Sequence, residues 1–400
     1  MRVGVGYSEN PDTVSAGLEA AQQALKQAER NGPCDLILLF YTSWHNPEIL
    51  RDAVISVVGD TPRIIGGGAV GAMTQAHYGY AGDQIGLAAI WLDEVECQLF
   101  SEGDLGISEE AVGQRLGAKM AEASIKPDTP VLMFYDAVDR TDEGMRLLMA
   151  TPLLNGIEQT LGFLPNLVGA GLQGDYAGTP VKQCLDKELL SREAIALSFS
   201  DSLRLDSIIM HGCHPATGYY TVTKADQQTI LEINGEPAID FMDKLLNSSI
   251  SPEQYPLFLI LGINSGNKWA EFDENHYASR LCIGIDKARK GIVMFEPDMV
   301  EGTEFQIMFR SFDLSYMKPK IEALFDSLNG RTPVFAFYID CAGRAAGYSG
   351  VDLEDAILLQ KTMAERVPFL GIYTGVEIAS IMGKPRALDW TGVLCLFSVE

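Results

Sequence analysis

One pattern, a helical stretch followed by a continuous apolar strand, recurs along this chain and constrains its fold most strongly. The apolar strands lie at residues 36–41, 131–136, 257–262 and 334–339. The helical stretches that precede them lie at 15–30, 107–123, 237–247 and 316–330. Continuous apolar strands that alternate with helices are typical of α/β folds, in which helices cover the faces of the sheets. We therefore expect an α/β protein with mixed sheets covered by helices.

The segments that follow these strands repeat as well. After three of them come a second helix and then a proline, a short apolar strand and a glycine cluster, at 62–71, 165–174 and 368–375. A hairpin-like pair of strands closes these copies, whereas the copy after 257–262 runs into hairpins instead. We interpret the repetition as an internal duplication with two related halves. A chain of 400 residues exceeds one ordinary core, so we expect domains at 1–212 and 213–400.

Charge and hydropathy exclude two classes of partner. Asp and Glu number 54 against 30 Lys and Arg, a net charge of −24, and no basic stripe is present. Such a chain repels phosphate backbones, so we expect no nucleic-acid binding. No apolar run approaches the roughly 18 residues of a membrane span, and the N-terminus does not resemble a secretory signal. We therefore expect a cytoplasmic protein without membrane contact.

The cysteines do not indicate a framework of disulfides or a zinc site. There are seven, an odd number, and they are widely spaced with no CxxC motif. Disulfide-rich and zinc-ribbon proteins show paired, regular spacings. Most of these cysteines lie in apolar runs and are expected to be buried.

Glycine clusters mark three strand ends, where α/β proteins bind ligands. They lie at 66–72, 168–175 and 341–350, the last together with 371–377 from the adjacent strand. Glycine allows a backbone to approach a ligand closely, but it serves tight turns and helix packing equally well. The candidate ligand-binding glycines of the first two clusters are Gly67, Gly68, Gly169 and Gly171. Neither GxGxxG with a downstream acid nor a P-loop is present, so nucleotide binding is not indicated.

The third cluster contains a lone arginine, Arg344. Acidic residues at 352, 354 and 355 fill the first turn of the following helix and would oppose a phosphate there. A single guanidinium suits a carboxylate, and Glu377 could face an ammonium group. We expect an amino acid or another small carboxylate to bind here, with Cys341, Gly343 and Tyr373 beside these two residues. The alternative is that Arg344 and Glu377 pair with each other or with the backbone.

Two further chemistries stay open. Cys341 would be a nucleophile, as in a thiol-dependent hydrolase, if a base lay nearby, but no histidine is marked as its partner, and we favour a buried, unreactive thiol. The segment HGCHP at 211–215 offers His211 and His214 as ligands for haem iron. Its alternative is a plain linker between the two halves.

Several motifs resemble those of one known family. Residues 211–242 resemble the segment that joins the N- and C-terminal parts of FIST proteins, with Gly212, Pro215 and LEINGEPA at 231–238. CAGR at 341–344 matches the family's Cys-x-Gly-Arg, and 371–378 resembles its Gly-φ-Tyr-Thr-x-Gly-Glu-Ile, with Val376 where glycine is expected. The resemblance runs from about Cys34 to Thr391. LDWTG at 388–392 departs from the polar stretch of the family.

The resemblance implies a sensory, ligand-binding module of signal transduction. Members are thought to bind small molecules such as amino acids, and some look like haem proteins that sense nitric oxide. No F-box, kinase or cyclase segment is visible, so we expect a separate effector such as a histidine kinase or a cyclase. We favour a non-enzymatic sensor without a cofactor. A haem-based nitric oxide sensor and a thiol-dependent hydrolase are the alternatives.

Overall fold

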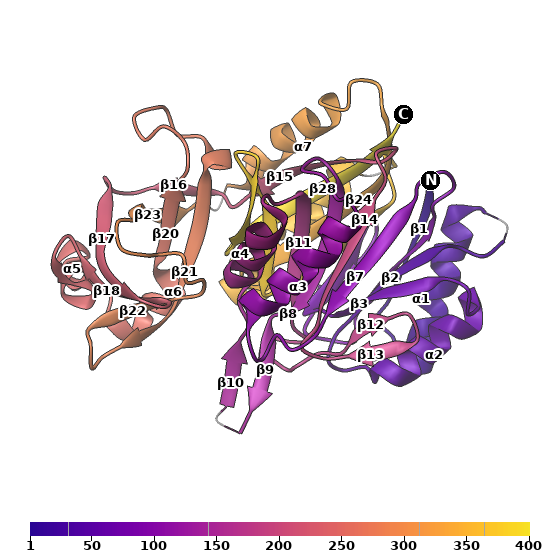
Figure 1. The fold of residues 1–400 in the computed structure, drawn as a ribbon, viewed down its shortest axis with the longest axis horizontal. Coiled ribbons are helices and arrows are strands. Elements are labelled where there is room, and N and C mark those ends of the chain that lie inside the picture. The colour runs from indigo at the N-terminus through magenta and orange to yellow at the C-terminus, as the bar shows by residue number, and fades with distance from the viewer. Residues whose placement is uncertain (31, 143, 312, 364) are drawn as a thin grey trace.

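The computed structural model describes residues 1–30, 32–142, 144–311, 313–363 and 365–400. These residues form three six-stranded mixed sheets, a closed barrel and a two-stranded hairpin. Figure 1 shows the barrel, in salmon and orange, to one side of an α/β body that also carries both termini. The expected fold class, α/β with mixed sheets covered by helices, is confirmed. No helix in the described part of the chain is long and apolar enough to cross a membrane.

Each six-stranded sheet is built on the same three-stranded centre. Two strands run parallel, and a third lies antiparallel to the first of them. The first sheet uses β2 (Leu36–Tyr41), β3 (Arg63–Gly68) and β6 (Ile85–Trp91). The second uses β8 (Pro130–Asp136), β11 (Asn166–Leu172) and β14 (Ala194–Phe199). The third uses β24 (Thr332–Cys341), β25 (Phe369–Thr374) and β28 (Gly392–Val399). The repeating pattern of the sequence therefore corresponds to three structural units.

An outer strand and two helices complete each unit. The outer strands are β1 (Arg2–Ser8), β7 (Cys97–Glu102) and β15 (Arg204–Met210), which pair with β6, β14 and β28. The helices are α1 (Thr13–Ala28) and α2 (Pro47–Val58), α3 (Glu109–Glu122) and α4 (Ala150–Leu161), and α7 (Met317–Asp326) and α9 (Asp355–Met363). Glycine allows the closest of these contacts, because a Cβ at Gly6 of β1 would overlap the carbonyl oxygen of Ala20 on α1.

The three units interlock by exchanging hairpins in a ring. Each unit sends the hairpin after its second parallel strand to the sheet of another unit. β4 (Gly71–Thr74) and β5 (Tyr78–Tyr80) join β25, β12 (Gln183–Leu185) and β13 (Glu188–Leu190) join β3, and β26 (Val376–Ile381) and β27 (Lys384–Leu388) join β11. One phenylalanine from each unit lies at the centre. Phe40, Phe134 and Phe337 pack with ring centroids 5.1 to 6.0 Å apart.

The barrel is inserted into the third unit, between β15 and α7. Its strands are β16 (Cys213–Pro215), β17 (Tyr220–Asp226), β18 (Thr229–Ile233), β20 (Ile260–Asn264), β21 (Tyr277–Asp286), β22 (Gly291–Met294) and β23 (Glu304–Arg310), with α5 (Ala238–Leu245) alongside. It closes because β20 pairs with both β21 and β23. The prediction of a strand at 257–262 is wrong at its start. Its first residues belong to α6 (Tyr255–Phe258), and β20 begins only at Ile260. The expected division at 212/213 falls between β15 and β16 and stays a prediction.

Candidate functional site

The segment after β24 lies where the third unit meets the barrel. β24 ends at Cys341, and short helical turns follow at Ala342–Arg344 and Ala346–Ser349. Gly350 then takes a left-handed conformation with φ 71°, which reverses the chain before α9. We name residues 342–354 the junction loop.

Arg344 anchors the junction loop, of which it is part, to buried groups of the protein. Its side chain is 1% exposed and forms ion pairs with Asp340, at 3.1 Å, and with Asp355. Its Nη1 donates to the carbonyl oxygens of His211, at 2.9 Å, and of Trp390, at 3.4 Å. The guanidinium therefore binds the protein's own carboxylates and backbone.

Glu377 and Cys341 are buried close together behind this network. Glu377 is 0% exposed and accepts from the amide of Thr391, at 3.2 Å, and from the hydroxyl of Thr374, at 3.4 Å. Burial raises the pKa of the Glu377 carboxyl well above its ordinary value. Burial, together with the Glu377 charge, also raises the pKa of the Cys341 thiol. A thiol that stays protonated is a poor nucleophile, so the geometry does not favour a hydrolase that uses Cys341.

Tyrosines from the other two units reach the junction loop. Tyr80, on β5 of the first unit, donates to Glu354 at 2.7 Å and accepts from the Gly347 amide at 2.8 Å. Tyr176 of the second unit donates to the carbonyl of residue 342 at 2.9 Å and stacks on Tyr348 at 4.9 Å. Tyr373, on β25, is buried and lies 3.4 Å from Glu354. All three units therefore contact this loop.

The candidate glycines separate into two places. Gly169 and Gly171 lie on β11 and pair with residues 378 and 376 of β26, on either side of Glu377. Gly67 and Gly68 lie on β3, where Gly67 pairs with Gln183 of β12. A Cβ at Gly68 would overlap the side chain of Val181. The structure thus brings Gly169 and Gly171 to Glu377, whereas Gly67 and Gly68 pack against a different hairpin.

The two candidate haem ligands differ in their surroundings. His211 is fully buried, its Nδ1 accepts from the Cys213 amide at 2.9 Å, and its Nε2 lies 3.3 Å from the Glu274 carbonyl. Burial lowers the pKa of His211 to about 4. A neutral imidazole with both nitrogens occupied has none left for iron, so His211 does not fit a haem ligand. His214 is exposed on β16, beside the rings of Phe272 and Phe309, and a surface position does not enclose a cofactor. Among the described residues no cluster of three or more His, Cys, Asp or Glu could hold a metal.

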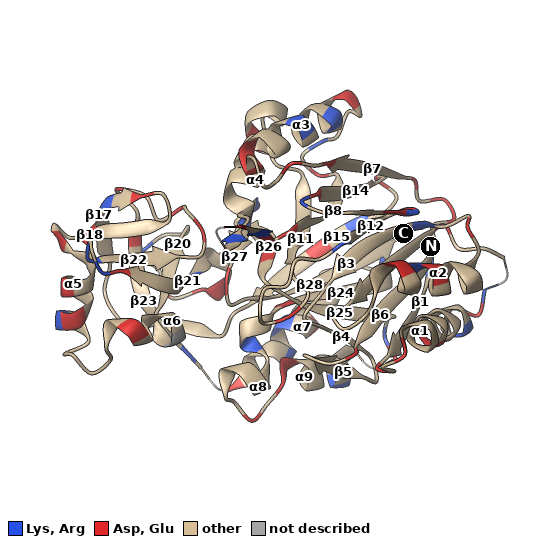
Figure 2. Cartoon of the chain, turned by 90° about the horizontal axis from the view of Figure 1, so that it is seen from below, with Lys and Arg blue, Asp and Glu red and all other residues tan. Residues whose placement is uncertain are grey.

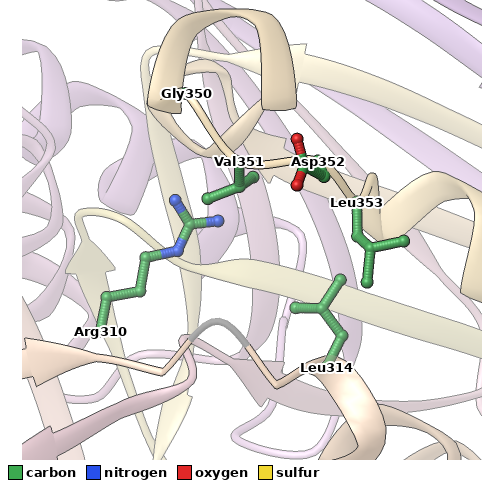
Figure 3. Close-up of a pocket in the computed structure, with 6 residues that line it drawn as sticks. All are labelled: Arg310, Leu314, Gly350, Val351, Asp352 and Leu353. Carbon is green, nitrogen blue, oxygen red and sulfur yellow. The ribbon is translucent and has the colours of Figure 1, made fainter.

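A cavity of about 360 Å³ lies on the barrel side of the junction loop. Among the described residues its lining comes from β23, the helical turn before α7 and the junction loop (Figure 3): Arg310, Leu314, Gly350, Val351, Asp352 and Leu353. None of the residues expected from the sequence to bind ligand is among them. The cavity is adjacent to the expected site, because Arg310 of its lining contacts the backbone of Arg344.

Arg310 is the functional candidate that sequence reasoning missed. Its guanidinium points toward Val351 in Figure 3 and lies 5.1 Å from the ring centroid of Trp390. Its Nη2 donates to the carbonyl oxygen of Arg344 at 3.4 Å. Within the described residues it forms no ion pair with a carboxylate. Burial and the nearby Arg344 charge lower the pKa of Arg310, but an arginine stays charged. Nothing in the stretch EFQIMFR marks this residue, because only barrel closure brings it to the loop.

Comparisons with known proteins cover almost the whole chain. The profile of the FIST N domain matches residues 35–236, and that of the FIST C domain matches residues 238–380. Uncharacterized proteins of Mycobacterium bovis and Mycobacterium tuberculosis are each 24% identical over 416 residues, 99% of either chain. Another uncharacterized protein of Mycobacterium tuberculosis is 23% identical over 409 residues, 99% of this chain and 100% of its own. FIST domains are associated with sensory signal transduction. The chain belongs to the FIST family, with both of its domains present.

Proposed function

We propose that this protein is a non-enzymatic sensor that binds a small carboxylate, such as an amino acid, between the barrel and the junction loop. The cavity of about 360 Å³ suits a ligand of that size. Leu314, Val351 and Leu353 supply apolar walls, and Asp352 supplies a carboxylate for an ammonium group.

The observation that carries the proposal is the unpaired Arg310 guanidinium. A partly buried arginine normally forms an ion pair, because desolvating its charge is unfavourable. Arg310 instead has a ring face and one long bond to a carbonyl oxygen. The carboxylate of a ligand would pair with the Arg310 guanidinium and accept two parallel hydrogen bonds from it. Arg310 thereby takes the role that the sequence suggested for Arg344.

The residues expected from the sequence then act beneath the ligand. Arg344 fixes the loop through Asp340 and Asp355, and Cys341, Gly343, Tyr373 and Glu377 remain proposed members of the site as its buried support. Because the loop contacts all three units, a ligand that orders it would change the surface offered to a separate effector protein.

Thermal unfolding in the presence of amino acids and small carboxylates tests this function. We expect at least one compound to raise the melting temperature of the wild type and to leave that of Arg310→Ala unchanged. Arg310→Lys, which keeps the charge but loses the planar fork, should retain a reduced shift. The matched control is Arg289→Ala, which removes an exposed arginine from the barrel turn and should respond like the wild type. Ligand shifts of equal size in Arg310→Ala and the wild type would refute the proposed site.

A further inference from the structure

A second cavity, of about 240 Å³, lies on the barrel junction away from the junction loop. The barrel contributes Arg280 and the segment 297–300, the second unit contributes α4, and the third unit contributes β27. Figure 2 shows basic segments in blue at β27, beside the barrel. A basic lining is unusual in a chain with a net charge of −24.

Three of the described residues that line this cavity are cations, and two of these are already neutralised by carboxylates. Arg280 is fully buried, pairs with Asp298 through two nitrogens and donates to the carbonyl of residue 387 at 3.0 Å. Lys384 lies 2.7 and 2.8 Å from the two carboxylate oxygens of Glu158. Neither has a charge left for a ligand.

Arg386 is the exception. It lines the cavity between Lys384 and residue 387 on β27. Its Nε is buried without a hydrogen-bond partner, and among the described residues no carboxylate pairs with its guanidinium. A buried donor without an acceptor is unfavourable. An oxyanion in the cavity would satisfy it with charge-assisted hydrogen bonds.

The N-terminus of α4 offers no free backbone amides to an oxyanion in this cavity. Glu296 of the barrel accepts from the amides of residues 150 and 151 at 3.0 and 2.9 Å, and so occupies the free helix amides. The remaining polar groups in the lining are the side chains of Thr151 and Asn155. Leu154, Leu164 and Val300 add apolar surface for a small organic part.

We propose that this cavity binds a small oxyanion, a carboxylate or a phosphate, through Arg386. The ligand bridges the barrel to α4 and β27, so its binding stabilises the attachment of the barrel to the α/β body. The site shares no lining residue with the cavity at Arg310, and it stands whether or not that cavity binds the sensory ligand.

Isothermal titration calorimetry and thermal unfolding of the full chain with inorganic phosphate and with acetate test the proposal, with sodium chloride of equal ionic strength as the reference. We expect phosphate to bind the wild type and Arg310→Ala equally, and we assign to this cavity the acetate binding that Arg310→Ala retains, because that variant lacks the guanidinium of the other cavity. Loss of a charged hydrogen bond predicts an apparent Kd about tenfold or more higher in Arg386→Ala. Arg386→Lys should fall between the two, and Arg289→Ala should match the wild type.

The pattern of binding identifies the source of the oxyanion. Phosphate binding alone assigns a phosphorylated ligand, acetate binding alone assigns a carboxylate, and binding of both assigns a general oxyanion site. No binding of either probe to the wild type would overturn the proposal. Equal binding to the wild type and Arg386→Ala would overturn it too. Arg386→Gln, which removes the positive charge but keeps a polar side chain with the same Cβ–Cγ–Cδ stem, replaces Arg386→Ala if the latter fails to fold.

Discussion

Replacing Arg344 with alanine should cost this protein much of its stability. The substitution leaves Asp340 and Asp355, which are 1% and 3% exposed, without their cation. It also removes the donor to the carbonyl oxygens of residues 211 and 390. Removing one partner of a buried ion pair costs about 3–5 kcal/mol, because a charge is left uncompensated in the interior. The free energy of unfolding of a native protein is only about 5–15 kcal/mol, so Arg344→Ala should be marginally stable at neutral pH.

Urea unfolding followed by circular dichroism measures this loss. Arg289→Ala is the matched control, because Arg289 also binds two carboxylates, Asp226 and Asp286, but its side chain is 47% exposed. Exposed ion pairs contribute little, so the control should unfold close to the wild type. The loss of stability in Arg344→Ala should become smaller at acid pH. Burial raises the pKa of Asp340, so this carboxyl can then take a proton and no longer needs a cation.

Equal midpoints for Arg344→Ala and Arg289→Ala would refute the reasoning, because the buried network would then not hold the junction loop. A variant that is fully stable but no longer responds to any small carboxylate would instead identify Arg344 as the direct ligand contact. That result would restore the assignment made from the sequence and remove the one made to Arg310.

Three other substitutions or reactions test separate parts of the structure. Gly6→Ala should destabilise the fold by about 1–3 kcal/mol in urea unfolding, because its Cβ would overlap the carbonyl of residue 20, whereas Gly218→Ala, with open space around it, should be neutral. Burial raises the pKa of Asp136 from 3.8 to about 7, so the folded state binds this proton more tightly than the unfolded chain does. The stability of the wild type should therefore fall as the pH rises from about 4 to 7 and the folded state loses the proton. Asp136→Asn should show a smaller fall, because Glu296, Asp389 and Glu193 also have raised pKa values and still contribute to it. In urea unfolding at pH 8 the variant should exceed the wild type by up to about 4 kcal/mol, whereas a parallel pH dependence in the two proteins would contradict this assignment. Cys341 should react with iodoacetamide at neutral pH only after unfolding, and mass spectrometry that finds it alkylated before the half-buried Cys97 would contradict its buried, protonated state.

The α/β fold class and the repeating unit were predictable from the sequence. Strand periodicity and helix composition are local properties, so LILLFY, VLMFYD and VFAFYI indicated equivalent strands before any contact was known. The equivalence extends to the core, where the phenylalanine of each FY pair occupies the same central position. The family resemblance was also present in short motifs, and the domain profiles confirm it.

The partners of the site residues were not predictable in the same way. The sequence placed Arg344 beside a ligand, but the helical turn after β24 returns it to Asp340, four residues earlier, and α9 brings Asp355 to its other side. Gly67 and Gly68 looked like Gly169 and Gly171, yet the hairpin exchange covers β3 with β12 and β11 with β26.

The sequence by itself determined which segments form strands and helices, and which residue types stand at the strand ends. Only the tertiary structure decided that Arg344 pairs with carboxylates and that Arg310 and Arg386 have no carboxylate partner among the residues that it describes. The reason is that an ion pair depends on which segments pack together. Barrel closure and hairpin exchange bring together residues far apart in the chain, such as Arg310 and Val351 or Arg386 and Thr151. Hydrophobic periodicity selects the buried face of each element, but it carries no information about the charge that a neighbouring element will present.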